Sequence, residues 1–317
     1  MKRRKFFQML FATAASWPVT SRAQHVVQPR IGVLSLQDPE PFLSGFRAGL
    51  RELGYVEGMN IRLEVRSAGG SIERLNDYAA DFARNKYDVI ATIQNAAAVA
   101  AKRATTRIPI VLISSGDPVA SGLVADLARP GGNITGMSAA TPAGKSLELL
   151  AEILPALQRV AAIVHKPDAA FGNAFLDQLG PVAQRLALQT RPVWIGRSDE
   201  IDKLVADFRK DRIDAAVLQG SLPLRVAEVA LKHRIPTAAS SSRFAGTEVL
   251  VNYSQDGTDV ARKAAAYVDR ILKGANPRDL PVQQPTKFEL VINTRTARAL
   301  SVTVPQSVLI RADRVID

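Results

Sequence analysis

Short hydroxyl and amide side chains recur just after the predicted strands of this 317-residue chain. The candidates at these positions, with two aromatic residues and one acid among them, are Ser35, Gln37, Gln94, Asn95, Ser114, Ser115, Asp117, Phe171, Gln219, Ser221, Asn252 and Tyr253. In open parallel sheets, ligands bind beyond the carboxyl ends of the strands. Side chains of these types orient a small polar molecule through hydrogen bonds, so the chemistry they favour is binding.

Each polar candidate also has a structural interpretation. Ser and Asn cap helices that follow strands, because their side chains accept hydrogen bonds from the first free backbone N–H groups. Asp117 stands before Pro118, a step that favours a turn as much as a buried carboxylate for a ligand amine. Both interpretations stay open at the level of the sequence.

Motifs typical of catalysis are scarce. The three histidines, His25, His165 and His233, lie far apart in the sequence, and no HExxH, GxGxxG, Walker or GxSxG pattern occurs. The chain has no cysteine, which excludes disulfides, a thiolate nucleophile and a cysteine metal site. We therefore expect no enzymatic activity, no cofactor and no metal.

Alternating strands and helices must position the candidate residues. Over residues 30–115 the short β-branched runs RIGVLS, IRLEVR, DVIATI and IPIVLIS alternate with amphipathic segments at 42–53, 72–85 and 96–104. A second series, RVAAIV, TRPVWIG, DAAVLQ, IPTAAS and EVLVNY, alternates with helices expected at 176–186, 200–210 and 223–233. This order predicts an α/β fold with two Rossmann-like lobes, each built on a parallel sheet, joined by a hinge.

Two segments rich in proline and glycine mark the expected crossings between the lobes. DPVASGLVADLARPGGNITGMS (117–138) separates the two series, and NPRDLPVQQPTK (276–287) follows a long helix expected at 259–273. We predict that lobe 1 comprises residues 28–137 plus about 256–285, and that lobe 2 comprises residues 138–255 plus about 286–317.

The N-terminal residues indicate export. Four basic residues, Lys2 to Lys5, precede an apolar segment, and SRAQ offers cleavage after Ala23, which is the order of features in a secretory signal. The segment is too short and interrupted to span a membrane, and its Arg3-Arg4 pair resembles a twin-arginine signal. We expect a cleaved signal at 1–23 and a periplasmic mature protein. A solvated tail or a nucleic-acid arm is the competing interpretation.

The net positive charge of the chain depends partly on the predicted signal. Removing residues 1–23 takes away five of the 41 Lys and Arg and none of the 30 acids, so the net charge falls from +11 to +6. The remaining basic residues are scattered among acids, whereas nucleic-acid binders cluster them on one face or segment. We expect no nucleic-acid partner.

Several long stretches resemble one known family. RIGVLS, GLRELGYVEGMNIRLEVRSAGG, GDPVASGLVADLARPGGNITGMS and ARALSVTVPQSVLIRADRVI are similar to the substrate-binding proteins of ABC import systems, in the subgroup that includes tryptophan-type receptors. The resemblance covers about residues 30–317 and implies a type I periplasmic binding protein fold, in which two lobes close over a ligand.

The resemblance implies a monomeric receptor that captures a small polar solute, such as an amino acid or a related organic acid, and delivers it to an ABC permease in the inner membrane. In this role Asp117 would bind a ligand amine. A carboxylate or hydroxyl groups would be held by Ser35, Gln94, Asn95, Ser114 and Ser115, while Gln219, Asn252 and Tyr253 would close from the other lobe. An exported enzyme, a cytoplasmic ligand-responsive regulator and a sensing partner of a membrane receptor are the alternatives.

The sequence departs from the family pattern where ligand specificity is expected. Ile93-Gln94-Asn95 replaces a Gly-Thr turn, and Lys166-Pro167 stands where Asn-Pro is common. The Arg243-Phe244 pair is kept, but Thr247-Glu248 replaces the downstream glycine pair. The departures concern the identity of the ligand and leave the expected fold unchanged.

Overall fold

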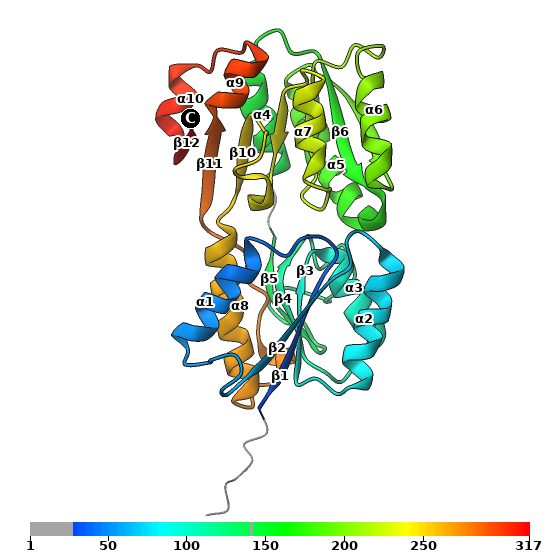
Figure 1. Ribbon diagram of the computed structural model, residues 1–317, viewed down its shortest axis with the longest axis vertical. Helices are drawn as coiled ribbons and strands as arrows, with labels where there is room; N and C mark the ends of the chain where they lie inside the picture. Colours follow the sequence, from blue (N-terminus) through cyan, green and yellow to red (C-terminus); the bar gives the residue numbers. More distant parts are fainter. Residues whose placement is uncertain (1–27, 140–141) are drawn as a thin grey trace, which may run out of the picture.

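The computed structural model describes residues 28–139 and 142–317, so the predicted signal at 1–23 lies outside the described residues. Two α/β lobes are stacked along the long axis of the molecule (Figure 1). Each lobe is a three-layer structure in which helices cover both faces of a central sheet. None of the helices in the described ranges has the length and apolar character needed to cross a membrane.

The first sheet has five strands in the order β2-β1-β3-β4-β5, and all its pairs are parallel. Its strands are β1 (Arg30–Ser35), β2 (Arg62–Ser67), β3 (Val89–Ile93), β4 (Ile110–Ser115) and β5 (Ile134–Ser138). Helices α1 (Phe42–Glu52) and α8 (Gly257–Leu272) cover one face, and α2 (Ile72–Arg84) and α3 (Asn95–Ala104) cover the other. The central strands are buried along their length, as expected of a sheet covered on both sides.

The second sheet has seven strands in the order β12-β11-β10-β9-β8-β6-β7. Its strands are β6 (Arg159–His165), β7 (Gln189–Ile195), β8 (Ala215–Leu218), β9 (Thr237–Ala239), β10 (Val251–Gln255), β11 (Phe288–Asn293) and β12 (Arg314–Ile316). Only the β10–β11 pair is antiparallel among the described strands of this sheet.

Helices also form two layers in the second lobe. One face is covered by α4 (Ala143–Ile153), α5 (Ala169–Arg185), α9 (Thr294–Leu300) and α10 (Gln306–Arg311), and the other by α6 (Ile201–Asp207) and α7 (Arg225–Lys232). Four short 3₁₀ turns complete the structure: η1 (Lys166–Asp168), η2 (Ser198–Glu200), η3 (Ser242–Phe244) and η4 (Pro277–Asp279).

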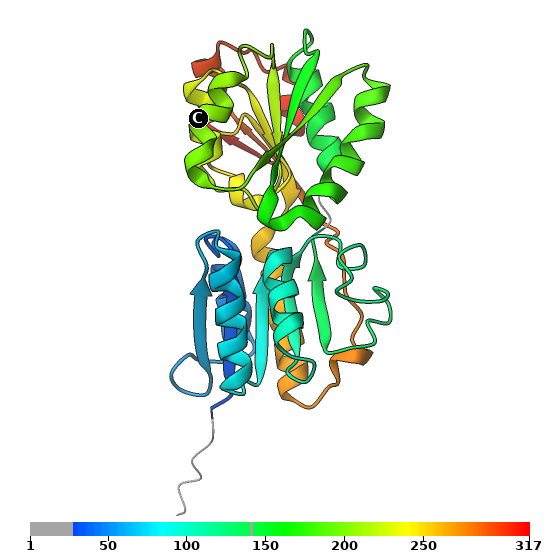
Figure 2. The ribbon, with the colours of Figure 1, turned by 90° about the vertical axis from the view of Figure 1, so that its right-hand side faces the viewer.

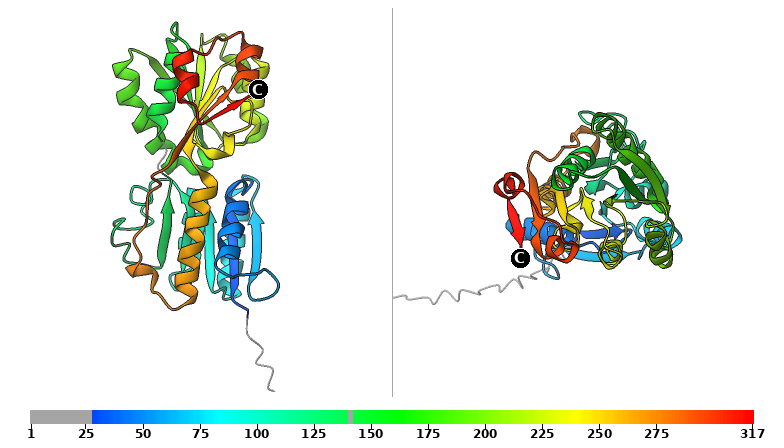
Figure 3. Two further views of the ribbon diagram at one scale, coloured as in Figure 1. Left: turned by 90° about the vertical axis from the view of Figure 1, so that its left-hand side faces the viewer. Right: turned by 90° about the horizontal axis from the view of Figure 1, so that it is seen from above.

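The chain passes between the lobes at more than one place. After β10 in the second lobe, α8 returns to the first lobe, and the segment that ends at β11 leads back to the second (Figure 3). Helix α8 is held close to α1, because a Cβ on Gly45 would lie 2.7 Å from the carbonyl oxygen of Thr258 and one on Gly49 would lie 2.8 Å from that of Arg262. The absence of side chains at these two positions therefore allows α8 to pack tightly against the first lobe.

Residues 134–138 correct one prediction. This segment was expected to be part of a crossing loop, but it forms β5 and pairs with β4. Gly136, at φ 124°, approaches the β4 backbone so closely that a Cβ would lie 2.4 Å from the carbonyl oxygen of Leu112. The glycine that makes this pairing possible also made the segment resemble a loop.

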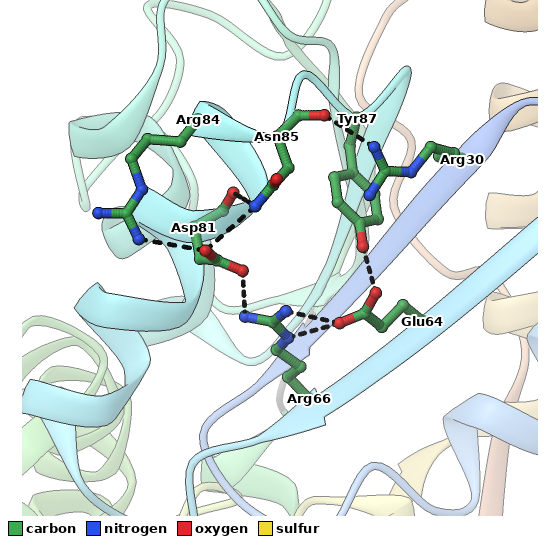
Figure 4. A network of polar contacts seen from close by, with 7 residues as sticks. All are labelled: Arg30, Glu64, Arg66, Asp81, Arg84, Asn85 and Tyr87. Atoms are coloured by element: carbon green, nitrogen blue, oxygen red, sulfur yellow. Dashed lines mark hydrogen bonds and ion pairs between the residues drawn. The ribbon is translucent and has the colours of Figure 1, made fainter.

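A network of charged groups fastens the edge strand β2 to α2 (Figure 4). Arg66 of β2 lies 2.6 Å from a carboxylate oxygen of Glu64 and 2.8 Å from one of Asp81 on α2. Tyr87 donates a hydrogen bond to Glu64, and the Arg30 guanidinium lies 4.1 Å from the centre of the Tyr87 ring. These contacts join three parts of the first lobe and are structural, because none of the five residues lines a cavity between the lobes.

Candidate ligand-binding site between the lobes

The strands of the first sheet point toward the second lobe, so their carboxyl ends meet the gap between the lobes (Figure 2). A cavity of about 30 Å³, called here the central cavity, lies at this junction. Its walls come from both lobes and from a segment that joins them: Phe42, Gln94, Asn95, Ser114 and Gly116 on one side, Phe171, Gly220, Ser221, Ser240, Ser241, Arg243 and Gln255 on the other, and Ala139 in the joining segment.

Five of the residues singled out from the sequence line the central cavity: Gln94, Asn95, Ser114, Phe171 and Ser221. Two more line separate interlobe cavities. Asp117 borders one of about 380 Å³, called here the outer chamber, and Gln37 borders one of about 580 Å³. Ser35, Ser115, Gln219, Asn252 and Tyr253 line none of the three cavities.

Gln94 presents an amide nitrogen at the junction. It has an unusual positive φ of 74° just before α3. Its side-chain oxygen accepts hydrogen bonds from the backbone N–H groups of Leu36 (3.1 Å) and Gln37 (3.0 Å), which fixes the orientation of the amide. Its Nε2 is buried with no partner among the described residues and remains available as a donor.

A chain of hydrogen bonds crosses from the first lobe to the second. Ser115 donates to the Asn95 side-chain oxygen at 3.1 Å, and Asn95 Nδ2 donates to Asp168 of η1 at 3.3 Å. Asp168 is buried, and desolvation raises the pKa of its carboxyl group to about 6 although the bond from Asn95 lowers it. Ser221 lies near enough to lower that pKa slightly, but without the geometry of a hydrogen bond.

A second interlobe bond involves the end of β10. Gln255 Nε2 donates to the Ser114 hydroxyl at 3.0 Å. The Gln255 side-chain oxygen is buried and has no partner among the described residues. It is therefore an acceptor available to a ligand in the central cavity.

Arg243 of η3 is a buried cation at the cavity wall. Only 5% of its surface is exposed, and its Nη1 donates to the carbonyl oxygens of Gly220 (2.9 Å) and Leu222 (3.1 Å). No carboxylate of the described residues lies within ion-pair distance, and Nε has no partner. Burial lowers the pKa of Arg243 to about 10, so the group stays charged at neutral pH. A buried charge of this kind is stable only with a compensating partner.

Orphaned polar atoms gather around the central cavity. Those on its lining residues are Gln94 Nε2, Ser221 Oγ, Ser240 Oγ, Arg243 Nε and Gln255 Oε1. Native proteins leave few buried polar groups unsatisfied, so a cluster of them indicates an external partner. Most of these atoms are donors and one belongs to a cation, which favours an anionic group; Gln255 adds an acceptor.

The contacts of the remaining candidates are internal. Ser35 donates to the Gln37 carbonyl oxygen at 2.6 Å, Gln219 accepts a hydrogen bond from the His165 backbone N–H, and Asn252 bonds to Ser254. Tyr253 stacks on Phe288 with 5.7 Å between ring centres.

Asp117 stabilises a turn through one oxygen of its carboxylate. Its Oδ1 accepts hydrogen bonds from the backbone N–H groups of Val119 and Ala120, each at 3.0 Å. This geometry stabilises the turn that the Asp-Pro step favours. The carboxylate next to the central cavity is that of Asp168.

Sequence reasoning missed three polar residues of the junction: Asp168, Arg243 and Gln255. Arg243 was visible as half of the Arg-Phe pair, but its role required knowing that η3 is buried. Gln255 was missed because the strand predicted at 248–253 in fact runs over Val251–Gln255. Ser240 directly follows β9, and only its position beside the cavity separates it from other polar loop residues.

Two α/β lobes that meet at a polar, donor-rich cavity define a solute-binding protein of the type I periplasmic binding fold. The family model for ABC transporter substrate binding proteins matches residues 38–316, and the chain belongs to this family. Membership implies a small-molecule ligand and an ABC permease as partner.

Relatives in this family are substrate-binding proteins. A tyrosine-binding protein from Clostridioides difficile is 28% identical over 283 residues, covering 86% of this chain and 81% of the relative. The ABC domain from Streptococcus pneumonia in complex with L-Trp is 25% identical, with a TM-score of 0.83 over 91% of this chain and 100% of that one.

Structural similarity differs between relatives of equal sequence identity. A substrate-binding protein with adhesive properties from Clostridium difficile, in its ligand-free, open structure, is again 25% identical over 91% of this chain and 99% of that one, but its TM-score is only 0.63. At equal identity, the present structure is thus closer to the L-Trp complex. The small volume of the central cavity agrees with closely approached lobes.

Proposed function

We propose that the mature chain is a periplasmic receptor that binds a small α-amino acid in the central cavity and presents it to an ABC permease, as a monomer and without catalytic activity. The observation that carries this proposal is Arg243, a buried guanidinium with no carboxylate partner among the described residues. The names of the two relatives that bind tyrosine and L-Trp support the same ligand class.

A carboxylate is the anion best suited to this guanidinium. The planar fork of arginine matches the two oxygens of a carboxylate, and charge-assisted hydrogen bonds are the stronger ones. In our proposal the carboxylate lies against Arg243 Nε, with the free hydroxyls of Ser221 and Ser240 as further donors. The ligand amine then faces the acceptors Gln255 Oε1 and Asp168.

The lobes contribute different groups, which couples binding to hinge closure. We assign residues 28–137 plus about 256–285 to lobe 1 and residues 138–255 plus about 286–317 to lobe 2, because the strands and helices of these ranges share a sheet or a core. Lobe 1 supplies Gln94, Asn95 and Ser114, and lobe 2 supplies Arg243. A ligand that contacts both favours the arrangement in which the lobes lie close together.

The test is binding by the mature chain, from residue 24, to matched pairs of ligands. L-tyrosine and L-tryptophan are compared by calorimetry and thermal unfolding with tyramine and tryptamine, which lack the carboxylate. A ligand at 100 times its dissociation constant should add about 2.7 kcal/mol of apparent stability. We expect at least one amino acid to bind and its decarboxylated analogue to bind at least about 100-fold more weakly, since a buried charge is then left unpaired.

Variants locate the carboxylate site. Arg243→Gln should abolish amino acid binding, while Arg209→Gln, at an exposed residue outside the site, should leave it unchanged. Circular dichroism reports whether each variant is folded, and Arg243→Lys retains the charge if the first variant is not. Equal affinity for amines and amino acids, or recovery of a chemically converted ligand, would overturn the proposal.

A further inference from the structure

Phe171 stands between two of the interlobe cavities. It is the third residue of α5, is 7% exposed, and lines both the central cavity and the outer chamber. Gly116 and Ala139 also line both spaces, of about 30 Å³ and about 380 Å³, so Phe171 is one part of the wall between them.

Gly116 makes room for the ring. A Cβ on Gly116, which follows β4 of the first lobe, would lie 2.5 Å from Phe171 Cδ2. A Cβ on Gly220, which follows β8 of the second lobe, would lie 3.9 Å from Phe171 Cε1, an ordinary van der Waals distance. The ring thus fills a slot between residues of the two lobes, and at Gly116 any larger residue would displace it.

The central cavity is too small for the proposed ligand. Its volume of about 30 Å³ holds only about two or three water molecules, whereas small-molecule sites measure roughly 300–1,000 Å³. Binding of an amino acid must move part of the lining.

The polar lining is tied down and the ring is not. Gln94 is anchored by two backbone N–H groups, Arg243 by two carbonyl oxygens, and Asn95 by Asp168. The phenyl ring of Phe171 has no group that donates or accepts a conventional hydrogen bond, so a change of its rotamer breaks none. Among these wall residues, Phe171 can therefore move with the smallest loss of polar contacts.

We propose, on the basis of the proposed function, that the Phe171 ring occupies the space that receives the ligand side chain, and that its displacement joins the central cavity to the outer chamber. Phe171 is then a specificity-determining residue for side-chain size. The outer chamber has apolar walls at Pro118, Val119, Leu127 and Phe288, which suit a large apolar or aromatic side chain, and polar walls at Asp117, Gln178 and Gln284, which suit a polar group at its end. The buried Ser138 hydroxyl, with no partner among the described residues, adds one polar contact there.

The first test compares ligands of different size. The dissociation constants of L-alanine, L-leucine and L-tryptophan are measured by calorimetry for the wild type, Phe171→Ala and Leu176→Ala. Leu176 is a partly buried residue on the same helix, packed against the core of the second lobe, and serves as the matched control.

Emptying the slot should favour large ligands. We expect Phe171→Ala to raise the preference for L-tryptophan over L-alanine by about tenfold or more, and Leu176→Ala to leave it unchanged. An unchanged preference in Phe171→Ala, or a fall in affinity for L-tryptophan, would overturn the proposal, because the ring would then be a fixed wall on which the ligand packs.

The second test needs no carboxylate. Indole should raise the unfolding temperature of Phe171→Ala and not that of the wild type or Leu176→Ala, as engineered apolar cavities bind small aromatic molecules. If indole stabilises Phe171→Ala while no amino acid binds the wild type, the proposed function is wrong, but the Phe171 ring does fill a space that can receive an aromatic group. If amino acids bind and indole stabilises none of the proteins, the space left by the Phe171 ring closes in Phe171→Ala. The inference about Phe171 is then wrong, while the proposed function is unaffected.

Discussion

The side-chain amide of Asn95 in the first lobe donates a 3.3 Å hydrogen bond to the carboxyl group of Asp168 in the second. This contact lies beside the central cavity and joins the lobes without a ligand. It also places an ionisable group at the junction, where desolvation governs its protonation.

Replacement of Asp168 should change how stability depends on pH. Burial raises its pKa from 3.8 to about 6, so the native protein binds this proton more tightly than the unfolded chain does. The contribution of Asp168 to stability is therefore least favourable above pH 6 and improves as the pH falls through about 6 toward 4. Asp168→Asn should be more stable than the wild type at pH 7.5, by at most roughly 3 kcal/mol.

Urea unfolding at a series of pH values checks this expectation. The advantage of Asp168→Asn should shrink steadily as the pH is lowered from 7.5 to 4.5. A difference between the two proteins that stays constant over this range would show that Asp168 is already neutral or that its carboxylate is compensated.

His165 should act in the opposite direction. Burial, and then the charge of Arg243, lower its pKa from 6.5 to about 4, so the native protein holds a neutral imidazole. The unfolded chain takes up a proton below about pH 6.5, and stability is lost as the pH falls from there toward 4. His165→Gln should unfold with a weaker loss of stability between pH 7 and 4.5 in the same titration, and an unaltered slope would contradict the prediction.

The α1–α8 contact should not tolerate a methyl group. Alanine at position 45 would gain up to about 1 kcal/mol of helix propensity, but its Cβ would lie 2.7 Å from the Thr258 carbonyl oxygen. Overpacking costs about 1–3 kcal/mol, so Gly45→Ala should lower the midpoint of urea unfolding. Gly132→Ala is the control, since no atom lies within 4 Å of its added Cβ; equal stability of the two variants would show that α8 moves away freely.

The charged network of the first lobe should depend on its central arginine. Arg66→Met removes both carboxylate contacts and leaves Glu64 and Asp81 without their shared cation. We expect a loss of about 1 kcal/mol, moderated by solvent because the Arg66 side chain is 24% exposed. Arg84→Met, at a side chain that is 76% exposed, should leave the thermal unfolding midpoint unchanged. A smaller loss of stability in Arg66→Met than in Arg84→Met would contradict the central role of Arg66 in the network.

The two parallel-dominated sheets were predictable because their strands carry continuous apolar runs and alternate with amphipathic helices. Strand β5 was not, since its pairing depends on Gly136 meeting the β4 backbone, a contact between segments that the sequence does not mark. Local pattern identifies buried strands, and tertiary contact decides the short glycine-containing ones.

Within the candidate site, the sequence placed residues at the cavity where a polar residue directly follows a central strand, as Gln94 and Ser114 do; their role in binding stays a prediction. Predictions failed to identify Arg243 and Asp168, which lie in 3₁₀ turns. A charged residue in a turn is usually expected to be exposed. The burial of these two depends on contacts with residues distant in the sequence, such as Gly220 for Arg243 and Asn95 for Asp168.

The tight seam between α1 and α8 determines where the molecule can bend. In the hinge closure that we propose, rotation at this crossing should be concentrated at Asp256, whose carboxylate caps α8, because α8 packs closely on α1 and β10 ends at Gln255. A residue next to a pivot moves less than residues far from it. We therefore expect Gln255 to stay beside Ser114 while the rest of the second lobe moves, so that an arriving solute meets this acceptor before the remaining groups.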